Sequence, residues 1–93
     1  MVLRFTWNLE KADRNLRKHG VSFTEASSVF GDRLALDIDD PVHYERESRF
    51  VILGYSERQR LLVVAYAEPE VDAVRIISAR RAAPRERRNY ESL

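Results

Sequence analysis

The sequence predicts a small α+β domain with a mostly antiparallel sheet. Two continuous apolar runs, residues 50–55 and 61–66, are joined by only five polar residues, a pattern typical of central strands paired as a hairpin. Two helical patterns with clear start signals precede these runs, and an arginine-rich helical pattern follows the last strand. The expected order of elements is β-α-α-β-β-β-β-α, in a single domain over residues 1–93.

The N-terminal elements follow from alternation and capping. Apolar and polar residues alternate in the string LRFTW near the start of the chain, which predicts a short first strand. Asn8 is the expected N-cap of a helix that runs to about His19, and Gly20 supplies the left-handed residue that ends it. Ser22 and Glu25 form a capping box that starts a second, short helix. Because the connection is so short, the two helices should form an α-hairpin.

Each of these helices has an apolar stripe that we expect to face the core. In the first helix the stripe consists of Leu9, Ala12 and Leu16. In the second helix it consists of Ala26, Val29 and Phe30. Both helices should therefore pack against the sheet.

The later elements are marked by alternation and turn residues. Residues 34–38 alternate between apolar and small or acidic side chains, which predicts a half-exposed strand. A turn over 68–72 leads into the last strand at 73–80. Pro84 fits the first turn of a final helix that reaches about Glu91.

The charges are unevenly distributed along the chain, although the net charge is only +1. Residues 1–19 carry five basic and two acidic groups, residues 25–47 carry two basic and seven acidic groups, and residues 75–93 carry six basic and two acidic groups. Such a dipolar chain can offer a basic face to nucleic acid and an acidic face to a basic partner. Fourteen of the sixteen basic residues are arginine, whose planar fork holds phosphate by two parallel hydrogen bonds. A high-GC genome would produce the same bias without any function.

The composition also excludes several classes of protein. There is no cysteine, and therefore no disulfide, thiol nucleophile or thiolate metal site. His19 and His43 are the only histidines and lie far apart, so we expect no metal and no other cofactor. No Walker loop, GxGxxG or GxSxG string is present, which leaves nucleotide hydrolysis and serine-hydrolase chemistry without support. The longest apolar run has seven residues and no signal peptide is recognisable, so the cytoplasm is the expected location.

The last strand is the most informative segment, because it is flanked by arginines. Strict alternation divides it into two faces. One face carries Val74, Ile76, Ser78 and Arg80. The other carries Arg75, Ile77, Ala79 and Arg81. Since one face must pack on the helices, either Arg80 or the pair Arg75 and Arg81 should look onto the open side. These arginines could hold a phosphate or could cap the sheet by ion pairing, and both interpretations stay open.

Two other polar groups have similarly divided interpretations. Glu45, Arg46, Glu47 and Arg49 crowd the entrance to the third strand. They could place a general base beside a phosphate clamp, or form a solvated salt-bridge cluster that contributes little to stability. His19 could be a catalyst or the C-terminal residue of its helix.

Four strings taken together closely resemble the BrnT family of toxins. They are WNxxKxxxNxxKHGVSFxxA over residues 7–26, ExR at 47–49 with Gly54, RIISAR at 75–80 and ERxxYE at 86–91. They keep their order and cover nearly the whole chain. The resemblance implies a RelE-like fold and a toxin of a type II toxin–antitoxin system that arrests translation as a ribonuclease. It also implies a BrnA-like antitoxin, whose ribbon-helix-helix domain binds the shared operator DNA.

The resemblance further implies which residues act. It points to Arg80, to Arg49 after Glu47, to Lys18 and His19 at the end of the first helix, and to Trp7. In a metal-independent endoribonuclease, Arg80 and Arg49 would stabilise the phosphorane, Glu47 or His19 would be the base, and Lys18 would assist. Trp7 could stack on an unstacked base or lie in the core. The residues expected to hold flanking phosphates are Arg75, Arg81 and Arg87.

A second hypothesis comes from a different class. The chain could be a non-catalytic interaction module that binds a DNA-binding partner, with its basic face serving only that contact. RNA integrity after expression of the protein alone separates the two hypotheses.

Overall fold

The computed structural model describes residues 2–38 and 49–92. Its elements are β1 (Arg4–Thr6), α1 (Leu9–His19), α2 (Phe23–Ser28), the 3-10 turn η1 (Val29–Gly31), β2 (Leu36–Ile38), β3 (Arg49–Tyr55), β4 (Leu61–Ala67), β5 (Ala73–Arg81) and α3 (Pro84–Glu91). The α+β class and the predicted order of elements are confirmed.

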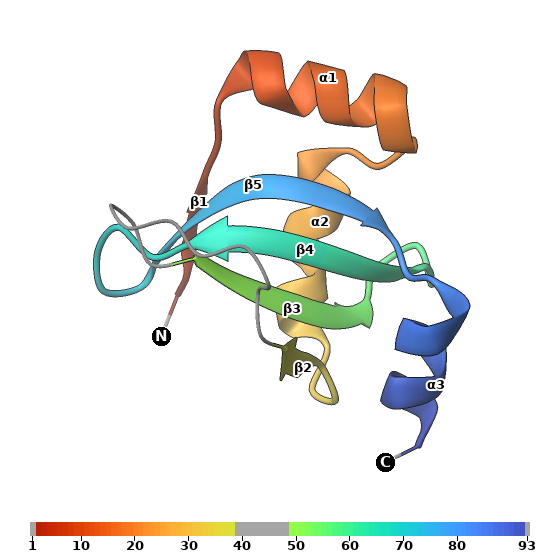
Figure 1. Ribbon diagram of the computed structural model, residues 1–93. Coiled ribbons are helices and arrows are strands. Elements are labelled where there is room, and N and C mark those ends of the chain that lie inside the picture. The colour runs from red at the N-terminus through yellow and green to blue at the C-terminus, as the bar shows by residue number, and fades with distance from the viewer. Residues whose placement is uncertain (1, 39–48, 93) are drawn as a thin grey trace.

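The strands form one five-stranded sheet in the order β1-β5-β4-β3-β2. Neighbouring strands are antiparallel except for β1, which pairs parallel with the start of β5. In Figure 1, α1 runs along the β5 side of the sheet, α2 lies behind the sheet, and α3 follows the end of β5. The sheet therefore has a helix-covered face and a second face, which is turned toward the viewer in Figure 1.

Each face of the sheet has its own apolar cluster. The helix-covered face holds the larger one, which comprises Val21, Phe23, Ala26, Val29, Ile52, Leu62, Val64, Tyr66, Val74, Ile76 and Ala79. The second face holds a smaller one, which comprises Val51, Leu53, Leu61 and Val63, with Tyr90 of α3 packed against it. This division agrees with the uninterrupted apolar runs of β3 and β4, because a strand that is buried on both faces has no row of side chains exposed to water.

The contact surface of α1 differs from the predicted apolar stripe. Leu9 is 79% exposed and Leu16 is 49% exposed, whereas Asn15 is only 7% exposed. The prediction that Leu9 and Leu16 face the core is therefore wrong. The physical reason is that α1 lies along the edge of a strand. The backbone N–H and C=O groups of that edge require hydrogen-bond partners, so a polar residue of α1 faces the sheet.

Asn15 supplies those partners. Its side-chain Nδ2 donates to the carbonyl oxygens of Val21 and Ala79, at 2.9 and 2.8 Å. Its Oδ1 accepts from the backbone N–H of Ala79 at 3.0 Å. One buried amide thus replaces a missing neighbouring strand at Ala79 and also closes the turn between α1 and α2.

A β-bulge interrupts the alternation of β5. Ala65 is paired with Ser78 while the next residue of β4, Tyr66, is paired with Ile76, so Ile77 is an extra residue. Beyond the bulge the side chains exchange faces. The strict alternation predicted above is therefore wrong in this strand.

The bulge brings Arg75 and Arg80 to the same side of the sheet. Ile76 and Ala79 both belong to the helix-side cluster, so their neighbours face the other way. Arg80 pairs with Val63, a member of the second-face cluster, whereas Arg81 pairs with Leu62 of the helix side. The predicted choice between Arg80 and the Arg75–Arg81 pair is replaced by a third arrangement, with Arg75 and Arg80 on the second face.

The start of α2 is held by a buried ion pair. Ser22 accepts from the backbone N–H of Glu25 at 3.0 Å, as half of the predicted capping box. The Glu25 carboxylate accepts from Arg60 Nε at 2.8 Å and from the Ser56 hydroxyl at 2.7 Å. Arg60 also donates to the carbonyl of Gly20 at 3.0 Å. These contacts tie the β3–β4 loop to both N-terminal helices.

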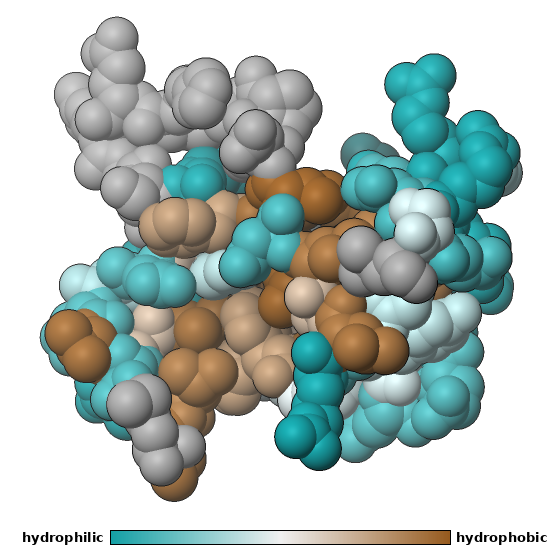
Figure 2. Space-filling view, turned by 90° about the horizontal axis from the view of Figure 1, so that it is seen from below, coloured by the Kyte–Doolittle hydropathy of each residue, from teal (hydrophilic) through white to brown (hydrophobic). Residues whose placement is uncertain are grey.

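Seen from below, where β2 is the last strand of the sheet, apolar surface gathers in the middle of the molecule (Figure 2). Hydrophilic side chains lie around this surface, and a few project across it.

We expect Asn15→Ala to lower the free energy of unfolding by about 2–4 kcal/mol, because it leaves both backbone groups of Ala79 without a partner. Asn15→Asp should be at least as harmful, since its carboxylate would face two carbonyl oxygens. Urea denaturation measures both variants. Asn8→Ala, which removes the N-cap of α1, is the control and should cost about 1 kcal/mol. Equal costs for Asn15→Ala and Asn8→Ala would contradict the role given to Asn15.

A second prediction concerns acid. The hydrogen bond from Arg60 lowers the pKa of Glu25 below its ordinary value near 4.5, although burial opposes it. A lowered pKa stabilises the fold above the unfolded-state pKa, and this contribution is lost as the pH falls through the folded-state pKa. Glu25→Gln should therefore cost about 1–3 kcal/mol at pH 7 and progressively less toward pH 3. Urea denaturation across this pH range measures the difference.

The matched control for Glu25→Gln is Asp13→Asn. The Asp13–Arg17 pair is exposed on α1, so its loss should change stability little at any pH. If the cost of Glu25→Gln does not shrink between pH 7 and pH 3, the carboxylate is not the source of the stabilisation.

Candidate nucleic-acid interface

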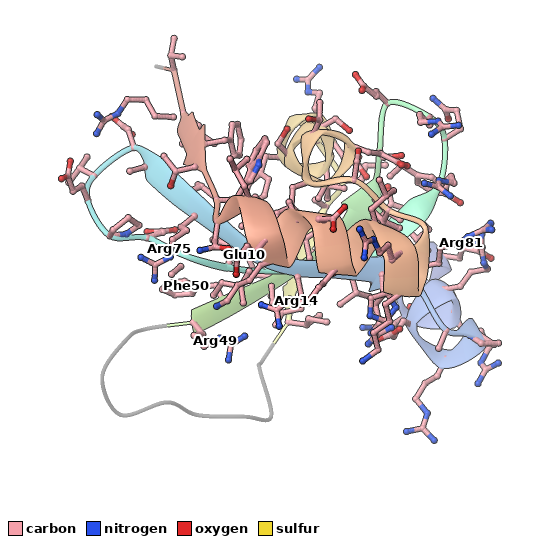
Figure 3. All side chains as sticks on the ribbon, turned by 90° about the horizontal axis from the view of Figure 1, so that it is seen from above. Glu10, Arg14, Arg49, Phe50, Arg75 and Arg81 are labelled. Atoms are coloured by element: carbon pink, nitrogen blue, oxygen red, sulfur yellow. The ribbon has the colours of Figure 1, made fainter. Side chains whose placement is uncertain are left out.

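The second face of the sheet carries a row of two arginines at one end. Arg49, Ala67 and Arg75 are neighbours across β3, β4 and β5. The strands of Arg49 and Arg75 are therefore about 10 Å apart, with a small alanine between them. In Figure 3 both arginines lie toward the N-terminal end of α1, and Arg14 extends from the helix on the same side as Arg49.

A groove between α1 and the bulge of β5 adjoins this row. It has a volume of about 340 Å³ and is lined by Lys11, Arg14, Asn15, Lys18, His19, Ile77 and Ser78. Three cations and one histidine therefore surround it, and none of the acidic side chains in residues 2–38 and 49–92 lines it. Asn15 forms part of its wall and also bonds to Ala79, so the helix is held to the strand at this point.

Arg80 extends from β5 two residues beyond Ser78 and is clasped by Glu86 of α3. Its Nη1 and Nη2 donate to the two carboxylate oxygens of Glu86, both at 2.7 Å. Nη1 also donates to the carbonyl of Arg81 at 3.3 Å. Glu86 is fixed in turn, because it accepts from the backbone N–H of Ala83 at 2.8 Å. The Arg80 guanidinium lowers the pKa of Glu86, against the effect of burial.

This clasp leaves a second fork on Arg80. A guanidinium has five N–H groups in a fixed plane, and three of them are used by Glu86 and Arg81. Among the described residues nothing engages the Nε–H or the second N–H of Nη2 of Arg80. These two donors are parallel and match the oxygens of a phosphate. Because the side chain is 44% exposed, a ligand can reach them.

α3 is anchored by a second set of contacts. Tyr90 donates to Asp32 Oδ2 at 2.7 Å, and the same oxygen accepts from the backbone N–H of Tyr55 at 2.8 Å. Burial, followed by the hydrogen bond to Asp32, raises the pKa of Tyr90 to about 12, so it remains a donor at neutral pH. Gly54 makes room for this contact, since a Cβ there would lie 3.0 Å from Val29 Cγ1 and 3.1 Å from Asp32 Oδ2.

The fold does not bring all of the predicted site residues together. Arg81 faces the helix side and lies beyond the C-terminal end of α1, far along the strand from Arg75 (Figure 3). Arg87 donates to the Tyr55 hydroxyl at 3.3 Å and pairs with Glu91. Trp7 packs edge-on against Phe23, with ring centroids 6.0 Å apart, beside the helix-side core.

Glu47 lies outside the described residues, as do His43, Glu45 and Arg46. Within residues 2–38 and 49–92, no three His, Asp or Glu side chains gather as a metal ion would require. No helix in this part of the chain is long and apolar enough to cross a membrane.

Sequence reasoning missed Lys11, Arg14 and Ser78 as members of the site. A signal for the two cations was present, because Lys11, Arg14 and Lys18 recur at spacings of three and four along one helix face. The apolar stripe of Leu9 and Leu16 directed attention to a different face. Ser78 could not be assigned, because the bulge that turns it outward has no mark in the sequence.

Known proteins share this sequence pattern and this fold. A family model described as "Ribonuclease toxin, BrnT, of type II toxin-antitoxin system" matches residues 7–86. Among solved structures, the crystal structure of the Brucella abortus ribonuclease toxin BrnT is similar, with a TM-score of 0.68 and 19% sequence identity. The similarity covers 88% of this chain and 99% of that one, and it shows a shared fold. Among curated proteins, no relative matches.

The protein is thus a ribonuclease toxin of the kind found in type II toxin–antitoxin systems. Because the family model spans most of the chain, it belongs to the BrnT family. The resemblance drawn from the four strings is confirmed.

Proposed function

We propose that this chain is a metal-independent endoribonuclease that arrests translation by cleaving RNA in the cytoplasm. One observation carries the proposal. Arg75 and Arg80 share the second face of the sheet, and the groove beside them adds Lys18 and His19. A polyanion can therefore meet cations from a strand and from a helix at one place.

The chemistry begins at the ribose. His19 accepts the proton of the 2′-hydroxyl as the 2′-oxygen attacks the adjacent phosphorus, with Glu47 as the alternative base. A bond from the 2′-oxygen to phosphorus forms, the bond from phosphorus to the 5′-oxygen breaks, and the leaving oxygen takes up a proton from water. The products are a 2′,3′-cyclic phosphate and a 5′-hydroxyl.

The phosphorane formed on this path carries two negative charges, and preorganised cations are the main means of stabilising it. Arg80 is the best-placed group, since Glu86 fixes its plane and leaves one fork for the phosphate. Lys18 adds a further positive charge from the groove. Arg49 and Arg75, which are neighbours across Ala67, hold the phosphates that flank the cleaved one.

The partner that belongs to this function is an antitoxin. We propose a BrnA-like protein with a ribbon-helix-helix domain, which neutralises the toxin and makes all contacts with operator DNA. Its toxin-binding segment should be acidic or amphipathic, because charge complementarity would exclude RNA from the basic surface.

We expect Arg80→Ala to reduce cleavage of a fluorogenic single-stranded RNA by about 10²- to 10³-fold, the usual cost of a lost oxyanion donor. Arg80→Lys should recover only part of this loss, because lysine has no fork. Arg85→Ala on α3 is the control and should cleave like wild type. If folded Arg80→Ala cleaves at the wild-type rate, the assignment is wrong. If the wild-type protein itself leaves RNA intact, the non-catalytic module is the better description.

Chelation tests the absence of a metal step. Cleavage should continue at an unchanged rate in excess EDTA, since arginine and lysine supply the positive charge of the site. Mass spectrometry of the products should find 2′,3′-cyclic or 3′-phosphate ends. Loss of activity in EDTA that magnesium restores would contradict this mechanism.

A further inference from the structure

Three cations on α1 face one groove, and no described acidic residue pairs with them. Lys11, Arg14 and Lys18 all line the space between α1 and the bulge of β5. Within the part of the chain that the structure describes, no ion pair or hydrogen bond engages the charged group of any of the three. The acids of the same helix do not compensate them, because Asp13 pairs with Arg17 at 3.0 Å and neither Glu10 nor Asp13 lines the groove.

This arrangement costs stability. Lys11 and Arg14 are three residues apart and Arg14 and Lys18 are four apart, so each pair lies side by side on the helix surface. Each like-charge pair at such spacings destabilises a helix by roughly 0.2–0.5 kcal/mol. Two other cations of the chain have anionic partners, Arg60 with Glu25 and Arg80 with Glu86. An anion bound in the groove would remove the repulsion within the row.

The row is also held rigidly against the sheet. Asn15 lies on the same side of α1, between Arg14 and Lys18, and its three hydrogen bonds fix the helix to Val21 and Ala79. The backbone positions that carry the cations are consequently fixed relative to the strand that carries the candidate catalytic arginine.

We propose that the α1–β5 groove, with Lys11 and Arg14 as its binding residues, holds the sugar–phosphate backbone of single-stranded RNA next to the cleaved phosphate. The proposal rests on the proposed ribonuclease function, to which it adds a binding site and a class of substrate. The groove leads to Ser78, which shares the second face with Arg75 and Arg80. A single strand of RNA can therefore pass from the groove to Arg80. The groove lies between one helix and one strand and has a volume of about 340 Å³.

The favoured ligand is RNA and not an acidic peptide. A row of lysine and arginine at regular spacing, with a hydroxyl at its end, fits the repeated charges of a phosphodiester chain. A peptide partner would instead need an apolar centre for tight binding. Among the residues that the structure describes, Ile77 is the single apolar side chain in the groove lining.

Binding of a 12-nucleotide 2′-O-methyl RNA tests the proposal, because this probe lacks the attacking hydroxyl and is not cleaved. We expect the double variant Lys11→Gln/Arg14→Gln to bind about 10-fold more weakly at low salt. The slope of log K against log salt should fall by about 1.4, which is 0.7 for each lost phosphate contact to a single strand.

The matched control is Arg17→Gln/Arg33→Gln, which removes the same charge from exposed positions outside the groove. It should leave the affinity within about 2-fold of wild type and leave the salt slope unchanged. If both double variants weaken binding equally, net charge alone is responsible and the groove is not a site.

The remaining outcomes are equally decisive. A 12-residue oligoglutamate tests the alternative ligand. If it binds as tightly as RNA, and if Lys11→Gln/Arg14→Gln weakens its binding to the same degree, the groove is a site for acidic peptide and the proposal is overturned. If wild type cleaves RNA but the groove variant keeps its affinity and salt slope, the groove fails while the ribonuclease function stands. If wild type binds the probe through the groove but cleaves no RNA, the proposed function fails and the groove stands.

Discussion

The arrangement of this protein depends on one buried side-chain amide. β1 pairs with the first part of β5 and then ends, which leaves the edge of β5 without a neighbouring strand at Ala79. Asn15 satisfies both backbone groups of Ala79 and the carbonyl of Val21, so α1, β5 and the entry to α2 meet at one residue. Because Lys11 and Lys18 stand one turn to either side of Asn15, the same hydrogen bonds that complete the sheet place cations beside it. Stability and charge placement therefore have a common origin in this fold.

A second constraint comes from the bulge at Ile77. One inserted residue brings Arg75 and Arg80 to the same face, where strict alternation would have separated them. α3 then completes the surroundings of Arg80, since Glu86 holds its guanidinium and Tyr90 binds the helix to Asp32. In this arrangement a carboxylate holds the guanidinium of Arg80 from one side, and the remaining N–H donors point toward the space where a ligand can bind. A functional group oriented in this way by a second residue is common in binding sites.

The sequence was a good guide wherever the signal was local. Asn8 and Gly20 cap α1 as predicted, the latter with a left-handed φ of 70°, and Pro84 begins α3. It was a poor guide where a residue's partner lies far along the chain. Glu25 had the spacing of a capping box, yet its carboxylate joins Arg60, because a charged guanidinium is a stronger partner than a backbone amide.

By itself, the sequence determined the class, the order of the elements, the ends of the helices and the family, because capping, alternation and the four strings are all properties of neighbouring residues. It also named Arg80, Lys18 and His19, through the resemblance. The tertiary structure alone decided which face of β5 carries Arg80, which side of α1 is buried, and that Lys11 and Arg14 share a groove. Those outcomes follow from a bulge and from a hydrogen bond between residues 64 positions apart, and neither feature is encoded in any local pattern.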